Sequence, residues 1–102
     1  MAYVILWEFR SRQGHESEFE AAYGPGGDWA RFFRQSPEYL GTELLRDLQE
    51  PSRYFTSDRW TSRRAYEEFR GHHLSEYDAL DRRCELLTSH EAPLGSFDTL
   101  DS

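Results

Sequence analysis

The sequence of 102 residues has a single cysteine, no long apolar run and few basic residues. Because Cys84 stands alone, the chain can form neither an internal disulfide nor a metal site built from several thiolates. The first ten residues lack the basic start and the small-residue cleavage site of a signal peptide, and no apolar run approaches the length of a membrane span. These absences predict a soluble, cytoplasmic protein.

The shortage of basic residues restricts the partners of the protein. Twelve Lys and Arg residues stand against nineteen Asp and Glu residues, which leaves a formal net charge of −7. Nucleic-acid affinity depends largely on basic side chains that neutralise phosphates, so this balance argues against a nucleic-acid partner. An anionic membrane surface is disfavoured for the same reason.

Aromatic residues, in contrast, are abundant. They make up 16% of the chain, with three Trp, six Tyr and seven Phe. The length suits one domain, residues 1–102, and a domain this small buries a limited core. We therefore expect some of the aromatic side chains to line a pocket or an interface.

The hydrophobic periodicity predicts four strands and four helical pieces. Alternating apolar and β-branched residues indicate strands, and apolar residues spaced three and four apart indicate helices. The "GPGG" segment separates the first two helical pieces, and Gly71 separates the last two. The predicted strands are 2–10, 38–47, 53–60 and 94–100, and the predicted helical pieces are 14–24, 28–36, 61–71 and 74–87.

This order, β-α-β-β-α-β with both helical regions split, predicts an α+β, ferredoxin-like fold with a four-stranded antiparallel sheet. Right-handed crossovers place the helices on one face of the sheet. The first strand is apolar on both faces in its first half, so we expect it to be covered on both sides. A second copy packed face to face would cover the open face and leave a cavity between the two sheets.

The segment "FRGHHLSEYDALD" (69–81) places two histidines before three carboxylates. His72 and Glu76 are four residues apart and can share a helix face. A zinc or iron site needs three or four ligands, and no third ligand stands at a recognisable spacing. We interpret the segment as a polar joint between two helices. The alternative is that His72 or His73 lines the cavity mouth as an acid–base group.

Three segments, "GHESEFEAAY", "PEYLGTELLRD" and "YFTSDRWTSRRAYEEF", resemble the antibiotic biosynthesis monooxygenase family of dimeric α/β barrels. Relatives of this type include cofactor-free oxygenases of anthrone- and quinol-like aromatics and heme-degrading enzymes. The heme-degrading members resemble one another in an Asn, a Trp and a His that here are replaced by Trp7, Phe69 and Ala79. The resemblance therefore implies no heme chemistry.

The anthrone-oxidising members carry a Trp at the end of the third strand, an Asn four residues earlier and a Tyr six residues later. Trp60 and Tyr66 match this pattern, and Thr56 replaces the Asn. An arginine on the later helix also contributes in that group; Arg82 or Arg83 lies nearby. Trp60 and Tyr66 each have a packing role as the alternative.

The resulting hypothesis is a homodimeric, cofactor-independent monooxygenase of a small electron-rich aromatic molecule, without cofactor or metal. The alternative is a non-catalytic small-molecule binding or interaction protein of the same fold, because fold alone does not decide function. Asp58 is expected in a surface ion pair with Arg46 or Arg53. The predicted catalytic residues are Trp60, Tyr66, Thr56 and Arg82, and the predicted substrate-binding residues are Trp7, Phe69, His72 and Tyr77.

Overall fold

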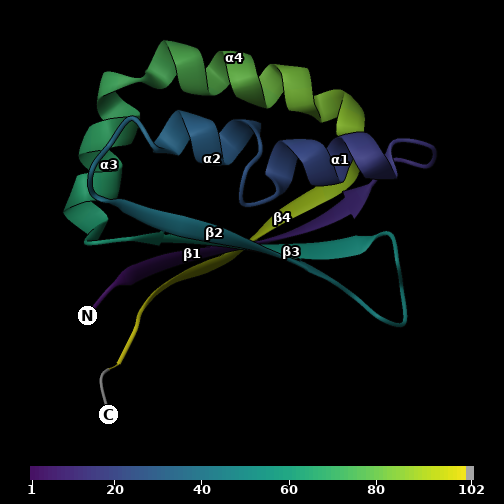
Figure 1. Ribbon diagram of the computed structural model, residues 1–102, viewed down its shortest axis with the longest axis horizontal. Helices are drawn as coiled ribbons and strands as arrows, with labels where there is room; N and C mark the ends of the chain where they lie inside the picture. The colour runs from purple at the N-terminus through teal and green to yellow at the C-terminus, as the bar shows by residue number, and fades with distance from the viewer. Residues whose placement is uncertain (101–102) are drawn as a thin grey trace.

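The computed structural model describes residues 1–100 and has the predicted β-α-β-β-α-β order with both helical regions split (Figure 1). The fold is ferredoxin-like and α+β. Its elements are β1 (Tyr3–Ser11), α1 (Glu16–Tyr23), α2 (Asp28–Phe33), β2 (Tyr39–Arg46), β3 (Arg53–Trp60), α3 (Arg63–His72), α4 (Leu74–Cys84), the 3-10 turn η1 (Glu85–Leu87) and β4 (Thr88–Asp98).

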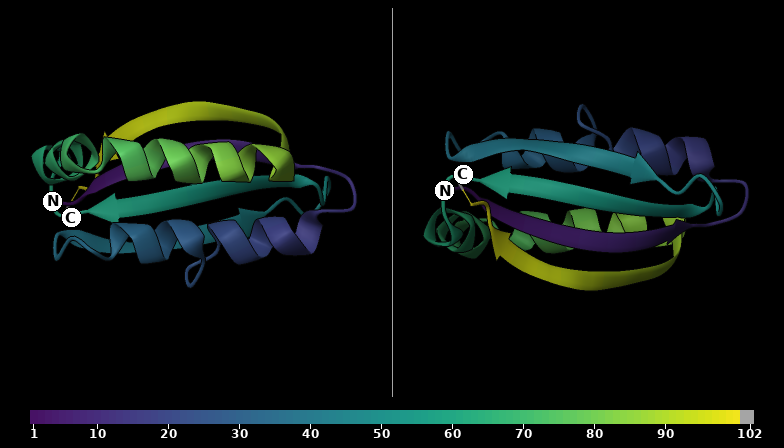
Figure 2. Two further views of the ribbon diagram at one scale, coloured as in Figure 1. Left: turned by 90° about the horizontal axis from the view of Figure 1, so that it is seen from above. Right: turned by 90° about the horizontal axis from the view of Figure 1, so that it is seen from below.

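The four strands form one antiparallel sheet in the order β2-β3-β1-β4. All helices lie on one face of this sheet, as predicted (Figure 1). Seen from below in Figure 2, the opposite face carries no helix. Tyr3 and Phe9 of β1 lie beneath the helices, whereas the face of Leu6 has no covering layer in the single chain. That a second copy covers this face stays a prediction.

The last strand is longer than predicted. The α4 helix ends at Cys84, and β4 runs from Thr88 to Asp98 rather than over 94–100. Pro93 lies inside β4 opposite Trp7, next to a register shift. An edge strand tolerates proline because it needs only half of its backbone hydrogen bonds, and a bulge relaxes that need further.

Irregular pairing in β2 changes which side chains face the helices. The pairing shifts between Tyr39 and Gly41, and Gly41 has φ +135°, a conformation that L side chains rarely adopt. A regular strand would place residues three apart on opposite faces. With the shift, Tyr39 and Thr42 both face the helices, opposite Trp60 and Asp58 of β3.

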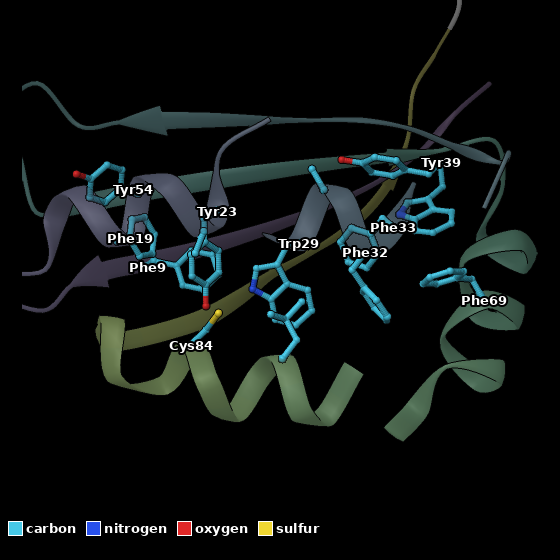
Figure 3. Packing of buried hydrophobic residues seen from close by; sticks show 14 of the residues in the cluster. Phe9, Phe19, Tyr23, Trp29, Phe32, Phe33, Tyr39, Tyr54, Phe69 and Cys84 are labelled. Atoms are coloured by element: carbon cyan, nitrogen blue, oxygen red, sulfur yellow. The ribbon is translucent and has the colours of Figure 1, made fainter. Parts of the chain in front are cut away.

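The core between sheet and helices is largely aromatic (Figure 3). Phe19 and Tyr23 of α1 stack at 4.5 Å between ring centroids, and Phe19 also meets Tyr54 of β3 at 4.6 Å. Figure 3 shows Cys84 of α4 beside Tyr23 and Trp29, so the single cysteine is a buried core residue. Each fully buried aromatic side chain of this kind contributes about 2 to 3 kcal/mol of hydrophobic stabilisation.

Candidate active site

A cavity lies between the sheet and the helices of a single chain. The aromatic face of β1 points toward the helices, where it lines this cavity. The expected cavity between the sheets of two copies stays a prediction. The strands supply its floor, which consists of Ile5, Trp7, Phe9, Thr42, Thr56, Asp58 and Glu91. The helices supply its roof, which consists of Tyr23, Trp29, Phe33, Tyr66, Tyr77 and Asp81.

The cavity is narrow and open on one side. The enclosed space measures about 60 Å³, enough for a few water molecules, and about 570 Å³ of empty space is included when the open side is counted. Glu91 of β4 is exposed, so it borders the mouth.

A chain of hydrogen bonds crosses the floor. Thr42 Oγ1 on β2 donates to Asp58 Oδ1 on β3 at 2.5 Å, and the hydroxyl of Tyr39 contacts Thr42 Oγ1. Because the Thr42 proton goes to the carboxylate, Tyr39 is the donor in the second bond. The hydrogen bonds therefore run from Tyr39 through Thr42 to Asp58, and the accepting carboxylate of Asp58 lies in the cavity floor.

Asp58 is a site residue that the sequence analysis missed, because we expected it in a surface ion pair with Arg46 or Arg53. Arg53 pairs instead with Glu8 at 2.5 Å on the outer face, and Arg46 lies 3.6 Å from Glu20. Asp58 points inward, where burial raises the pKa of its carboxyl to about 6, and the hydrogen bond from Thr42 works in the opposite direction.

Three tyrosines in the roof are potential hydrogen-bond donors. Burial raises the pKa of Tyr23, Tyr66 and Tyr77, so all three stay protonated at neutral pH. The guanidinium of Arg70 on α3 lies 4.6 Å from the ring centroid of Tyr77, a cation–π contact on the cavity wall. This arginine, which the sequence analysis did not single out, lies beside the two lining tyrosines Tyr66 and Tyr77 and is not itself part of the lining.

The charges among the described lining residues are all negative. They belong to Asp58 on the floor and to Asp81 and Glu91. Burial raises the pKa of Glu91, and repulsion from Asp81 and Glu85 adds to that effect. No Lys, Arg or His of the described chain lines the cavity, so it disfavours anionic ligands.

The structure brings four of the predicted site residues to the cavity: Trp7 and Thr56 from the floor, and Tyr66 and Tyr77 from the roof. Thr56 is buried at 4% exposure opposite Trp7 in the sheet. Tyr66 is half-buried near the start of α3, where Ser62 caps the helix by accepting a 3.1 Å hydrogen bond from the Ala65 N–H. The predicted meeting of β3 and α3 at the site is therefore present.

Trp60 and Phe69 lie behind the cavity wall instead of lining it. Trp60 is fully buried, with ring centroids 5.4 Å from Tyr66 and 5.4 Å from Phe69. Its indole N–H meets no acceptor within residues 1–100. Trp60 supports Tyr66 from within the core, and Phe69 packs on Trp60 in turn.

Arg82 and His72 are exposed and do not line the cavity. On α4, Tyr77 and Asp81 face the cavity at a spacing of four, which turns Arg82 toward solvent. His72 ends α3, and His73 follows as the joint to α4. His73 Nδ1–H donates to the Phe69 carbonyl at 2.9 Å and its ring stacks on that of Phe69, so the segment forms the interpreted polar joint.

No group of three or more His, Cys, Asp or Glu side chains in the described part of the chain is placed to hold a metal ion. None of its helices, within residues 1–100, has the length and apolarity needed to cross a membrane.

Among solved structures, SnoaB, a cofactor-independent oxygenase from Streptomyces nogalater, is similar at 21% identity and a TM-score of 0.70, covering 99% of this chain and 95% of that one. A candidate antibiotic biosynthesis monooxygenase from Deinococcus radiodurans has a TM-score of 0.76 at 13% identity, covering 100% and 95%. One from Bordetella bronchiseptica has a TM-score of 0.73 at 15% identity, covering 97% of each chain.

These identities show the shared fold and do not carry over an activity. No curated protein matches the sequence. The family of antibiotic biosynthesis monooxygenases, in contrast, matches residues 2–76. Because this match spans well over half of its length, the chain belongs to the antibiotic biosynthesis monooxygenase family.

Proposed function

We propose that this protein is a homodimeric, cofactor-independent monooxygenase of a small electron-rich aromatic molecule, of the anthrone or quinol type. The observation that carries the proposal is the cavity itself. Aromatic side chains form its walls, Thr56 lines the floor, and Tyr66 lines the roof. A flat substrate stacked between these walls meets hydroxyl groups from two sides. The similarity to SnoaB, a cofactor-independent oxygenase, supports the same chemistry.

In this proposal the substrate supplies the electrons. Once deprotonated, an electron-rich aromatic passes an electron to dioxygen without a flavin or a metal, so the protein has only to bind, deprotonate and shield it. The Tyr66 hydroxyl donates a hydrogen bond to the substrate oxygen on which negative charge develops. Trp60 holds the Tyr66 ring from behind, and Phe69 packs on Trp60.

The proposed dimer covers the outer face of the sheet. Leu45 and Phe97 belong to this face, since they pair with Phe55 and Val4, and both are about half exposed. Some charges on the same face already have partners within the chain, such as Arg53 with Glu8, which lowers the cost of covering them. A second copy on this face leaves the cavity on the helical side accessible.

The narrow enclosed space favours a second candidate, a non-catalytic binding protein of the same fold. A cavity of about 60 Å³ with aromatic walls can bind one edge of a small ligand without catalysing a reaction on it. The two candidates differ in one observable, since only the oxygenase consumes dioxygen when an aromatic ligand binds.

Oxygen uptake by the purified dimer tests the proposal. Anthrone and hydroquinone are added without flavin or metal, and binding is followed by the fluorescence of Trp7 and Trp29, which line the cavity. The proposal expects uptake, less than about one-tenth of a metal ion per chain by elemental analysis, and no Soret band. Tight binding without uptake establishes the binding protein instead. One metal ion per chain that survives dialysis contradicts the cofactor-free mechanism.

A further inference from the structure

We propose that Asp58 is the base of this cavity: its carboxylate removes a proton from a neutral aromatic C–H or O–H acid, and Thr42 and Tyr39 hold it in position. This inference rests on the proposed function and names both its proton acceptor and the class of its substrate. It stands on the placement of the carboxylate, on the hydrogen bonds to one of its oxygens, and on the charges around it.

The placement of Asp58 suits a proton acceptor. The residue lies near the end of β3, opposite Ile5 of β1 and Thr42 of β2, with its side chain in the cavity floor. Oδ1 accepts the 2.5 Å hydrogen bond from Thr42. No donor in the described chain meets Oδ2, so this oxygen is left to accept a proton from a ligand.

The hydrogen-bond chain has one direction only. Tyr39 donates to Thr42, and Thr42 donates to Asp58, so neither hydroxyl competes for a proton that arrives at Oδ2. The shift at Gly41 brings Tyr39 and Thr42 to the same face of β2. A regular strand would have turned one of them away, and Asp58 would then lack its fixed orientation.

The surroundings keep Asp58 basic. On β2 it faces Thr42 and Tyr39, on α3 the uncharged phenol of Tyr66, and on β1 and α2 the apolar Ile5 and Phe33. The remaining charged groups lining the cavity are Asp81 of α4 and Glu91 of β4, and burial is what disfavours the ionised form of Asp58. Arg70 contacts the ring of Tyr77 and forms no ion pair with Asp58.

With no cation beside it, the carboxylate has a pKa of about 6, so it is ionised at neutral pH and still a stronger base than a solvated aspartate. A base whose pKa lies near the working pH is the most effective one.

The charges also restrict the substrate. Three carboxylates line the cavity and no described basic residue does, so carboxylated or phosphorylated substrates are repelled. The ligand must enter neutral and become an anion only inside, where Asp58 takes its proton and Tyr66 donates to the resulting oxyanion. Cyclic aromatic ketones with an acidic CH₂ group, and phenols, are acids of this class.

In an aromatic ketone with a CH₂ group, a C–H bond of that group breaks and its proton moves to Asp58 Oδ2. The electron pair stays on the substrate as an enolate. The enolate gives one electron to dioxygen, and the resulting radical and superoxide combine in a C–O bond. The peroxide takes the proton back from Asp58 and loses water to leave a second carbonyl. One oxygen atom enters the product, the other leaves as water, and the base is regenerated.

Anaerobic mixing with anthrone isolates the proton transfer, because the coloured anthrone enolate accumulates when dioxygen is absent. The wild-type dimer is expected to show the enolate band with a midpoint near pH 6. In Asp58→Asn the band should be lost, and turnover in air should fall by a factor of about 1,000, while anthrone still quenches the tryptophan fluorescence. Asp78→Asn, which changes an exposed residue of α4, is the matched control and should behave as wild type.

Thr42→Val tests the positioning role. Because the Thr42 hydrogen bond lowers the pKa of Asp58, its loss should move the acidic limb of kcat/KM to higher pH and leave activity on the alkaline side largely intact. An acidic limb that stays in place would contradict the role of Thr42.

The two proposals fail in different ways. Full turnover by Asp58→Asn overturns the base and leaves the oxygenase standing. Enolate formation without oxygen uptake supports the base and overturns the oxygenase. A ¹³C NMR titration that places the Asp58 carboxyl below pH 4.5 overturns the base whatever ligand binds.

Discussion

Thr42 and Asp58 face each other across neighbouring strands, with 2.5 Å between the hydroxyl and the carboxylate oxygen. The contact joins β2 to β3 inside the cavity. It depends on the irregular pairing at Gly41, which lets Tyr39 contact the same hydroxyl. A carboxylate enclosed in this way, without a cation, must affect the stability of the fold as pH changes.

The free energy of unfolding should reveal Asp58. Its pKa is about 6 in the folded chain against an ordinary 3.8, so between these values the folded state binds the proton more tightly than the unfolded chain. The stabilisation is therefore complete below about pH 4 and lost as pH rises through 6. A shift of this size corresponds to about 3 kcal/mol. Urea denaturation should show wild type losing up to about this much relative to Asp58→Asn between pH 4 and 7. Parallel stability curves would contradict the buried carboxylate, and the exposed Asp78→Asn is the control.

The outer sheet face should mediate dimerisation. Replacing Leu45 and Phe97 by Glu puts two charges into the proposed interface, where neither has a partner, and should yield a folded monomer. Light scattering at micromolar concentration measures the outcome, with circular dichroism to verify folding. Leu48→Glu is the control, since Leu48 is 95% exposed in the β2–β3 turn. A wild-type monomer, or a dimer that survives the double substitution, would refute this interface.

Gly27 should be irreplaceable, whereas Gly26 should not. A Cβ atom on Gly27 would lie 2.3 Å from the Ala21 carbonyl oxygen and 2.6 Å from that of Ala22, and backbone atoms cannot move aside cheaply. Gly27→Ala should cost at least about 2 kcal/mol in unfolding free energy. A Cβ on Gly26 meets nothing within 4 Å, so Gly26→Ala should change stability by less than about 1 kcal/mol. If urea denaturation shows the same loss of unfolding free energy for both variants, close backbone packing around Gly27 is not what requires glycine there.

The fold followed from local patterns, because strand alternation, helix spacing and the glycine stops are local properties. Alternation also predicted that Thr56 and Trp60 share a face, as they do. The same alternation places Asp58 on the face of Thr56 and Trp60. We assigned it to the surface because of its charge, although its position in the strand indicated the inner face. What alternation cannot show is the shift at Gly41, because that depends on how β2 and β3 pair.

The division between cavity and core also required tertiary structure. Trp60 and Tyr66 are equally plausible site residues by spacing, but Phe69 and Tyr39 pack on Trp60 and enclose it. Tyr66 has one side free toward the cavity. Which of two contacting aromatics is enclosed depends on the third and fourth rings around them, and these come from distant elements.

Tyr66→Phe is the sharpest test of the roof. The change removes one hydroxyl and keeps the ring, whose packing on Trp60 and Tyr3 at 5.4 and 6.1 Å between centroids should persist. Since burial raises the pKa of Tyr66, the hydroxyl is protonated at neutral pH and can donate to the substrate oxygen. If that donation stabilises the developing oxyanion, turnover in the oxygen-uptake assay should fall by a factor of about 100. The melting temperature should move by only about a few degrees.

The matched control for Tyr66→Phe is Tyr77→Phe, since Tyr77 lines the same roof from α4. A donor placed for the substrate oxygen should be unique, so the Tyr77 variant should lose much less activity. Full activity in Tyr66→Phe removes its hydroxyl from the mechanism. Because the two hydroxyls hydrogen-bond to each other, equal losses in both variants would mean that they act as a pair and that Tyr66 is not the single donor.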